Sequence, residues 1–355
     1  MTPDTTTPET TTPETVLIAP AATADANPGG HRSAWHALVR WESALVLVLI
    51  GVLIYGSDQS STFLDGTNFF YIGLNMGEIA IMALPLTLIV MTGEIDLSVA
   101  SMLGLSGTVT GALFADGWSI WAAMAAALLV GAAGGALNGV LVAKLGLPSI
   151  AVTIGTLTLF RGIAEILLAP RTITGFPISL TDIGVIPIPG TELAYSGAIF
   201  LALAIACGVV LHATALGRKI VAIGLQPEAA QFSGIRVNRI KLGLFILSGV
   251  LCALAGILFT LKNASVSYDA GTGLELNVVA IVLFGGVSIF GGRGTIIGVV
   301  LAVVIVGCLQ QILTQLNVQP EVQNIITGLL LLISVIIPNS REAARRIRTR
   351  ARTHG

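Results

Sequence analysis

The sequence predicts an all-α protein that crosses a membrane about ten times. Of its 355 residues, 54% are hydrophobic and only 10% are charged, whereas a soluble domain carries roughly 25% charged residues. A helix needs about 20 apolar residues to cross a bilayer core of about 30 Å. Uncharged stretches of about that length occur at Leu97–Ala115, Gly117–Ala143, Leu242–Leu261, Gly294–Pro320 and Val322–Ser340.

The first element is a tail. Residues 1–40 are rich in Thr, Pro and Ala, so they cannot bury a core and are expected to be disordered. They lack a basic start followed by an apolar run, which excludes a signal peptide. Residues 41–339 form the predicted membrane domain, and residues 340–355 form a basic tail. Within the domain, spans are expected at 43–57, 71–91, 97–115, 119–143, 148–168, 195–214, 242–261, 276–290, 295–316 and 322–338.

The distribution of Lys and Arg orients these spans. Basic residues cluster in Gly217–Lys241 and again in the tail 340–355. Basic loops stay on the cytoplasmic side, and the four spans between the clusters allow both to lie there. Six spans precede the first cluster, so the amino terminus is also expected in the cytoplasm, beside Arg32 and Arg40. Pro170–Ala194 is then the largest outward loop, with room for a soluble partner.

Two segments, 135–160 and 307–333, echo each other weakly. Gly, Leu, a polar amide, Leu and Pro fall at matching offsets, and the predicted topology puts the two prolines on opposite sides. Such a pattern indicates an inverted repeat of the kind found in transporters, although shared apolar composition also produces similarity. The matching pairs include Asn138 with Gln310 and Pro148 with Pro320.

The cytoplasmic loop of residues 215–241 contains helix signals of its own. Pro227 and Glu228 suit a first helical turn, and Gly234 suits the helix end. Ala229 and Ala230 are small, so the surface of another protein can approach closely. An ordinary positive-inside loop explains the charges without a partner, and both interpretations stay open here.

The segment TGEIDLS places Glu94 and Asp96 between two apolar runs. Ionisable groups so close to the hydrocarbon usually face a cavity or a partner. Gly93 and Ser98 flank a helix break at which Asp96 suits a capping position. The carboxylates are therefore expected either to cap a helix or to line a transport path.

The segment from Leu283 to Gly298 contains six glycines in LFGGVSIFGGRGTIIG, which indicates close helix packing or an interrupted helix. The chain has no G-x-x-x-x-G-K-[ST] motif, so nucleotide hydrolysis is not expected. Candidate pathway or helix-break residues are Asn75, Gly93, Glu94, Asp96, Ser98, Asn138, Gly285, Gly286, Gly291, Gly292, Gln310 and Gln311.

Residue patterns for catalysis are missing from the sequence. The four His lie in tails or at a span end, and Cys207, Cys252 and Cys308 lie inside apolar runs, where small buried side chains are usual. Neither set has metal-ligand spacing, so we expect no enzyme and no bound metal. Arg161 and Glu165 lie four residues apart on one helix and are expected to pair.

From about Trp41 to Asn339 the chain resembles the permease subunits of bacterial ATP-binding-cassette importers for monosaccharides such as ribose, xylose and galactose. The resemblance is carried, in the family's order and spacing, by GEIDLSVAS, GALNGVLVAKLGLPSIAVTIGTLTLFRG, LGRKIVAIGLQPEAAQFSGIRVNRIK, LAGILFT and AIVLFGGVSIFGGRGTIIG. The commonest form of the first motif has Gly-Gly-Ile-Asp. Glu94 in place of the second Gly looks like the rhamnose and autoinducer-2 branch.

The resemblance implies the fold of a type II importer permease in the cell (inner) membrane, surrounded by lipid, together with several partners. A second permease copy or close relative completes the pathway, and an extracytoplasmic binding protein delivers the sugar. Separate ATP-binding-cassette subunits use ATP and Mg, while this chain binds no cofactor and no nucleic acid. The alternative is a stand-alone ion-coupled secondary transporter or channel, which usually places ionisable residues in mid-membrane. The implied coupling-loop residues are Gly217, Arg218, Gly224, Pro227, Glu228, Ala229, Ala230, Gly234, Ile235 and Arg236.

Overall fold

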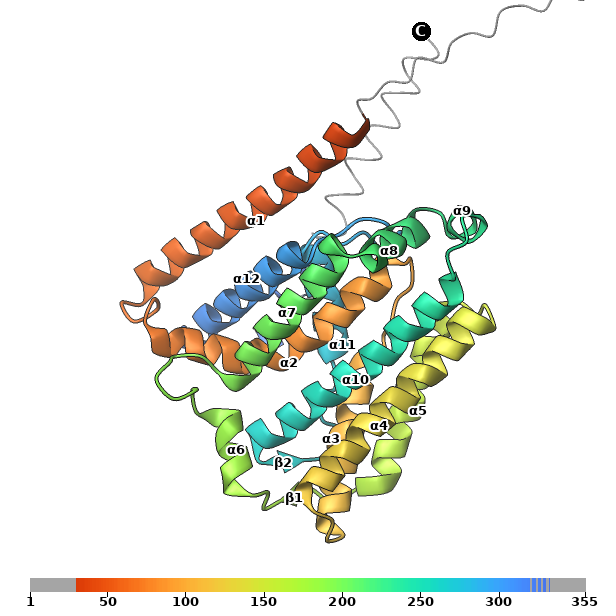
Figure 1. Ribbon diagram of the computed structural model, residues 1–355. Helices are drawn as coiled ribbons and strands as arrows, with labels where there is room; N and C mark the ends of the chain where they lie inside the picture. Colours follow the sequence, from red (N-terminus) through yellow and green to blue (C-terminus); the bar gives the residue numbers. More distant parts are fainter. Residues whose placement is uncertain (1–29, 320, 324, 327, 330–331, 333–355) are drawn as a thin grey trace, which may run out of the picture. The chain divides into compact units, whose positions relative to one another are not determined.

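The computed structural model describes residues 30–319, 321–323, 325–326, 328–329 and 332 (Figure 1). Most of the predicted N-terminal tail and all of the basic C-terminal tail lie outside these residues. The chain divides into two units, residues 1–38 and 39–355. Of the first unit, only the helical start of α1 (Gly30–Gln59) is described, and everything that follows concerns the second unit.

The second unit is built from helices and one two-stranded ribbon. Within the described residues, seven helices are long and apolar enough to cross a membrane, and α3 and α11 are shorter apolar helices. After α1 the helices are α2 (Gly66–Met91), α3 (Val99–Ala115), α4 (Ile120–Gly139), α5 (Ser149–Leu168), α6 (Ile178–Val185), α7 (Tyr195–Ala213), α8 (Ala215–Leu225), α9 (Pro227–Phe232), α10 (Val237–Asn263), α11 (Leu274–Phe284) and α12 (Ile296–Gln315). A π-helical turn, η1 (Val140–Lys144), extends α4, and β1 (Ile173–Thr174) pairs antiparallel with β2 (Ser265–Val266).

The predicted span at 276–290 is wrong in its extent. The helix α11 ends at Phe284 after 11 residues, too few to cross a bilayer core as helix. The chain then turns at Gly286, Gly291 and Gly292, where φ is positive, a backbone conformation that glycine adopts without strain. The glycine-rich segment is thus an interrupted helix, which was one of its two sequence interpretations.

The core lies around α2 and α10. Every residue of α2 from Met76 to Met91 is buried, because α7, α10, α11 and α12 all pack against this helix (Figure 1). On its other sides α10 packs against α3 and α4. Gly131 of α4 faces the backbone of Gly249 of α10 without room for a side chain, so the two helices approach closely, as small residues allow in membranes.

The helices α2 and α10 run antiparallel and begin two similar successions of elements. Lys241 near the start of α10 pairs with Glu94 beyond the end of α2, and Lys262 near the end of α10 pairs with Glu78 of α2. Each long helix is followed by a non-helical segment, a shorter apolar helix and a longer one, α3 and α4 in the first case and α11 and α12 in the second. This order, with reversed direction, supports the inverted repeat.

Candidate coupling and transport site

The coupling segment consists of α8, α9 and the turn between them. Thr214 precedes α8, and its hydroxyl oxygen accepts hydrogen bonds from the N–H groups of Leu216 and Gly217, which caps the helix start. The helix buries Gly217 and Ile220 and exposes Arg218. It therefore lies flat against the protein with its charged face outward.

The predicted helix in this loop is present as α9. Pro227 occupies its first turn together with Glu228, and Gly234 follows its end with a φ of 81°. Ala230 packs into a small apolar cluster with Ile223 and Val237, which fixes α9 to α8 and to the start of α10. Phe232, which sequence reasoning did not single out, is 93% exposed. It is the most exposed large hydrophobic side chain among the residues that the structure describes.

The structure joins two groups of residues that were predicted separately. Gly224 of α8 faces the carbonyl oxygen of Met91 and the backbone of Gly292, and Gly291 faces Gly224 and the amide of Gly93. The amide of Gly292 donates a hydrogen bond of 2.9 Å to the carbonyl oxygen of Met91. We call this meeting of backbones the glycine joint: Gly93 beyond α2, Gly224 of α8, and Gly291 and Gly292 of the loop before α12.

The segment from Gly93 to Ser98 is held from several sides. Glu94 forms an ion pair with Lys241, the two side chains being 17% and 13% exposed. The amide of Ile95 donates to Ser149 Oγ over 3.1 Å, and Thr153 Oγ1 donates to the carbonyl oxygen of Ile95 over 3.2 Å. The segment therefore bridges α2, α5 and α10, and the charge of Glu94 is compensated within the protein.

Asp96 is the centre of a buried hydrogen-bond network. Only 3% of the surface of Asp96 is exposed to solvent. Oδ1 accepts from the Ser98 amide (3.0 Å) and hydroxyl (2.6 Å), and Oδ2 accepts from the Ser248 hydroxyl of α10 (3.0 Å). Asn138 of α4 donates to Ser98 Oγ over 2.8 Å. Burial raises the pKa of the Asp96 carboxyl, while the hydrogen bonds from Ser98 and Ser248 act in the opposite direction.

This network corrects the expectation that Asp96 caps α3. The residue at the N-cap position is Ser98, and Asp96 instead closes the turn before the helix and ties α3 to α4 and α10. The space around Asp96, Ser98 and Asn138 has no room for a water molecule. The side chains of the network are therefore closely packed in this conformation.

The remaining pathway candidates lie elsewhere. Asn75 of α2 is exposed, while Gln310 and Gln311 of α12 are partly buried, and no hydrogen bond connects them with Asp96 in the part of the chain that the structure describes. Gly285 packs against the backbone of Val299 in α12. Gly286 packs against the indole of Trp41, whose Nε1 donates to the carbonyl oxygen of Phe284 over 3.2 Å.

Two charged residues, one partly buried and one buried, show long-range contacts that sequence reasoning missed. Arg161 donates to the carbonyl oxygen of Ala270 across α3; the expected pair with Glu165 is not among the ion pairs of the described residues. Glu78, 2% exposed, binds Lys262 at 2.8 Å. The signal for the second pair was a lone carboxylate inside one apolar run and a lone ammonium at the end of another.

Metal ligands are not grouped in the described ranges: no three His, Cys, Asp or Glu side chains lie where they can hold one ion. The three cysteines are free and buried.

Comparisons with known proteins agree with a transport role. Residues 68–335 match the family described as branched-chain amino acid transport system, permease component. The ribose import permease of Escherichia coli (strain K12) is 34% identical over 320 residues, which cover 88% of this chain and 98% of that protein.

A second relative has a different named cargo. The autoinducer 2 import system permease of Photorhabdus laumondii is 33% identical over 309 residues, 83% of this chain and 90% of that protein. No solved structure matches the chain. With a family match over most of its length and apolar helices of spanning length, the chain is a membrane protein that belongs to this family of transport-system permeases.

Proposed function

We propose that this chain is the pathway subunit of an ATP-driven importer for a neutral monosaccharide or a similar polyhydroxylated molecule. The proposal rests on the structure of α9. This short helix is anchored to α8 and α10 and exposes Phe232, where a partner can bind, and the relatives of the chain are import permeases. The partners are ATP-binding subunits at α9, a second permease copy or close relative, and a binding protein at the opposite side of the membrane.

The orientation follows from the charges. Arg218, Lys219 and Arg236 around α9 are exposed, and the positive-inside rule supports a cytoplasmic position for α9. The start of α10 is then cytoplasmic and its end, near Asn263, faces outward. This arrangement puts the glycine joint and the Asp96 network on the side of the ATPase.

The charges favour a neutral cargo over ion coupling. Glu94 is paired with Lys241, Glu78 is paired with Lys262, and Asp96 accepts three hydrogen bonds. An ion-coupled carrier usually has an ionisable side chain that is available to its ion in mid-membrane. These three carboxylates are engaged by the protein itself, which disfavours the stand-alone carrier.

Three compounds are candidate substrates. The names of the relatives give ribose and autoinducer 2, and the GEID motif adds rhamnose. The test is a gentle-detergent purification of the tagged chain, with identification of co-purifying proteins, followed by uptake of these three compounds in liposomes that contain the complete complex. Co-purification of an ATP-binding subunit together with ATP-dependent uptake of one compound supports the proposal. Purification of the chain alone, with uptake driven by an ion gradient, contradicts it.

The docking assignment is tested with Phe232→Ala. Removing an exposed aromatic anchor from an interface usually costs about 2 kcal/mol or more of binding free energy, so the ATP-binding subunit is expected to be lost from the purified complex. Phe69→Ala is the matched control, because Phe69 is also exposed (41%) but lies in the first turn of α2, at the other end of that helix from the glycine joint. Equal retention of the ATP-binding subunit by both variants contradicts docking at α9.

A further inference from the structure

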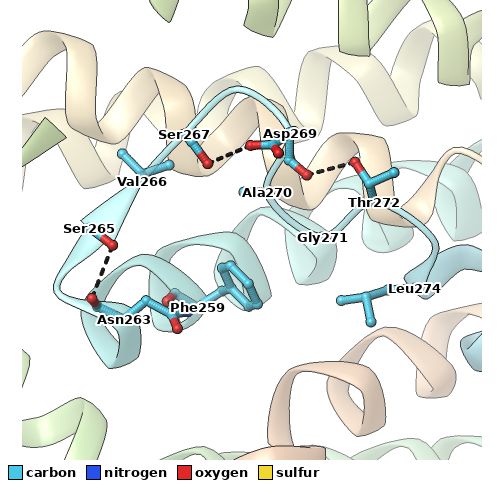
Figure 2. A pocket seen from close by; sticks show the side chains of 10 residues that line it. All are labelled: Phe259, Asn263, Ser265, Val266, Ser267, Asp269, Ala270, Gly271, Thr272 and Leu274. Carbon is cyan, nitrogen blue, oxygen red and sulfur yellow. Dashed lines mark hydrogen bonds between the residues drawn. The ribbon is translucent and has the colours of Figure 1, made fainter. Parts of the chain in front are cut away.

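A hollow lies at the end of α10 that is farthest from α9 (Figure 2). It is formed by the last turns of α10, the loop 264–273 and the start of α11, and has a volume of about 500 Å³. Small-molecule sites typically have volumes of about 300–1,000 Å³. The 27 residues of α10 separate it from the coupling segment by about 40 Å at 1.5 Å per residue.

The polar groups of this hollow are mainly hydrogen-bond acceptors. The Ser267 hydroxyl donates to Asp269 Oδ1 (2.5 Å), and the Thr272 hydroxyl donates to the carbonyl oxygen of Asp269 (2.6 Å), as Figure 2 shows. The hydroxyl of Ser265 likewise donates to the carbonyl oxygen of Asn263 over 3.1 Å. Each hydroxyl proton is used within the loop, so lone pairs remain for a ligand, and Asp269 Oδ2 accepts no bond from the described residues.

This lining selects a class of ligand. Among the ten lining residues only Asp269 is ionisable. One carboxylate is too little negative charge for a metal cation, and the lining has no cation to bind a phosphate. A ring that carries several hydroxyl donors satisfies the acceptors, and its bonds to the carboxylate are the strong, charge-assisted kind. The Phe259 ring and the Leu274 side chain supply an apolar wall in Figure 2 for the C–H faces of such a ring.

The place of the loop in the fold gives the hollow a role. The loop 264–273 follows α10 as the segment 92–98 follows α2, and α2 and α10 are antiparallel. The space around the Asp96 network has no room for a water molecule, whereas the counterpart loop borders a hollow of about 500 Å³. The strand β2 of this loop pairs with β1 of the 170–194 segment, which sequence analysis placed on the outer face.

We propose that this hollow is the outer entry site for the sugar, where a neutral polyhydroxylated ring first binds the permease after leaving its binding protein. The site accepts hydroxyl donors at Asp269, Ser267 and Thr272 and packs the ring against Phe259. The proposal rests on the import function proposed above, and its test separates the two.

The experiment uses the complete transporter in liposomes, with the loaded binding protein outside and ATP inside. Thr272→Cys introduces an exposed thiol in the hollow, while the three native cysteines are buried. A bulky, charged thiol reagent is then added from outside. Thr191→Cys is the matched control: Thr191 is also exposed and also donates to the carbonyl oxygen three residues earlier (2.9 Å), but it does not line the hollow.

Uptake by each labelled variant is compared with uptake by the same variant before labelling. If the unlabelled parent transporter imports none of the three compounds, the proposed function fails and the entry site with it. After labelling, Thr272→Cys is expected to lose uptake while the loaded binding protein still stimulates ATP hydrolysis, and Thr191→Cys is expected to keep both. Unchanged uptake in labelled Thr272→Cys overturns the entry site alone. Loss of stimulation together with uptake overturns it too, since it shows that the hollow is a docking surface for the binding protein.

Discussion

The glycine joint gives the sharpest test of how ATP use is linked to transport. A Cβ at Gly224 meets the carbonyl oxygen of Met91 and the amide of Gly292, both backbone groups that have no rotamer to change. Gly224→Ala must therefore push α8 away from α2 or from the glycine-rich loop. Overpacking of this kind usually costs about 1–3 kcal/mol, and Ala returns roughly 0.8–1 kcal/mol through its better helix propensity.

The net loss of folding stability is thus expected to be about 0–2 kcal/mol, small enough for insertion and for docking of the ATPase at α9 to persist. Transport is expected to suffer more. If the joint must stay closed while α8 moves, about 1–3 kcal/mol acts directly on the coupling between the two sites, which corresponds to roughly 5–150-fold. A complete transporter that contains the Gly224→Ala variant should hydrolyse ATP and import little sugar.

The assay measures sugar imported per ATP hydrolysed in liposomes, after the level of each variant has been equalised. Gly208→Ala in α7 is the control, because a Cβ at Gly208 meets no atom within 4 Å. A ratio in Gly224→Ala within about twofold of the parent, far below the roughly 5–150-fold range of typical coupling energies, refutes the idea that this joint transmits the motion.

Two further predictions concern the buried polar groups. Ser248→Ala removes the donor to Asp96 Oδ2 and is expected to destabilise the protein by about 1–3 kcal/mol, the usual effect of leaving a buried acceptor unsatisfied. The control is Ser106→Ala, which should be near neutral because the buried hydroxyl of Ser106 has no partner among the described residues. Equal thermal shifts of the two variants in detergent count against the network. Lys262→Met leaves Glu78 buried without its partner and is expected to cost about 3–5 kcal/mol, most of which the double variant Glu78→Gln/Lys262→Met should restore; a double variant no more stable than the single one contradicts this.

Features that depend only on residues close together in the sequence were predictable. The helix α9 follows from Pro227 at its start and Gly234 after its end, since both residues act through their own φ angles. The long spans follow from apolar length alone. The end of α11 was missed although Gly286 follows it with a positive φ, the usual glycine signal for a helix end, because glycines inside membrane helices also serve close packing.

Partners distant in sequence were not predictable. Arg161 was assigned to Glu165 because i,i+4 neighbours on a helix are the nearest charges that one sequence shows. In the fold, Arg161 instead reaches Ala270, 109 residues away. The pairs Glu94–Lys241 and Glu78–Lys262 were missed for the same reason, because their partners are distant in sequence. In each case the pairing is set by how α2, α5 and α10 pack, which periodicity does not encode.

Through these contacts, α2 connects the glycine joint with the end of α10 that borders the hollow. Its end at Met91 belongs to the glycine joint, so movement of α8 acts on it directly. About 20 Å away, at 1.5 Å per residue, Glu78 holds Lys262, the neighbour of Asn263 at the rim of the hollow. This whole stretch of α2 is buried, and it contains Pro85, which removes one backbone hydrogen bond of the helix. Under the proposed function, a shift of α8 driven by ATP is expected to reach the outer loop through α2 and this ion pair, and Lys262→Met should weaken coupling even where Glu78→Gln restores stability.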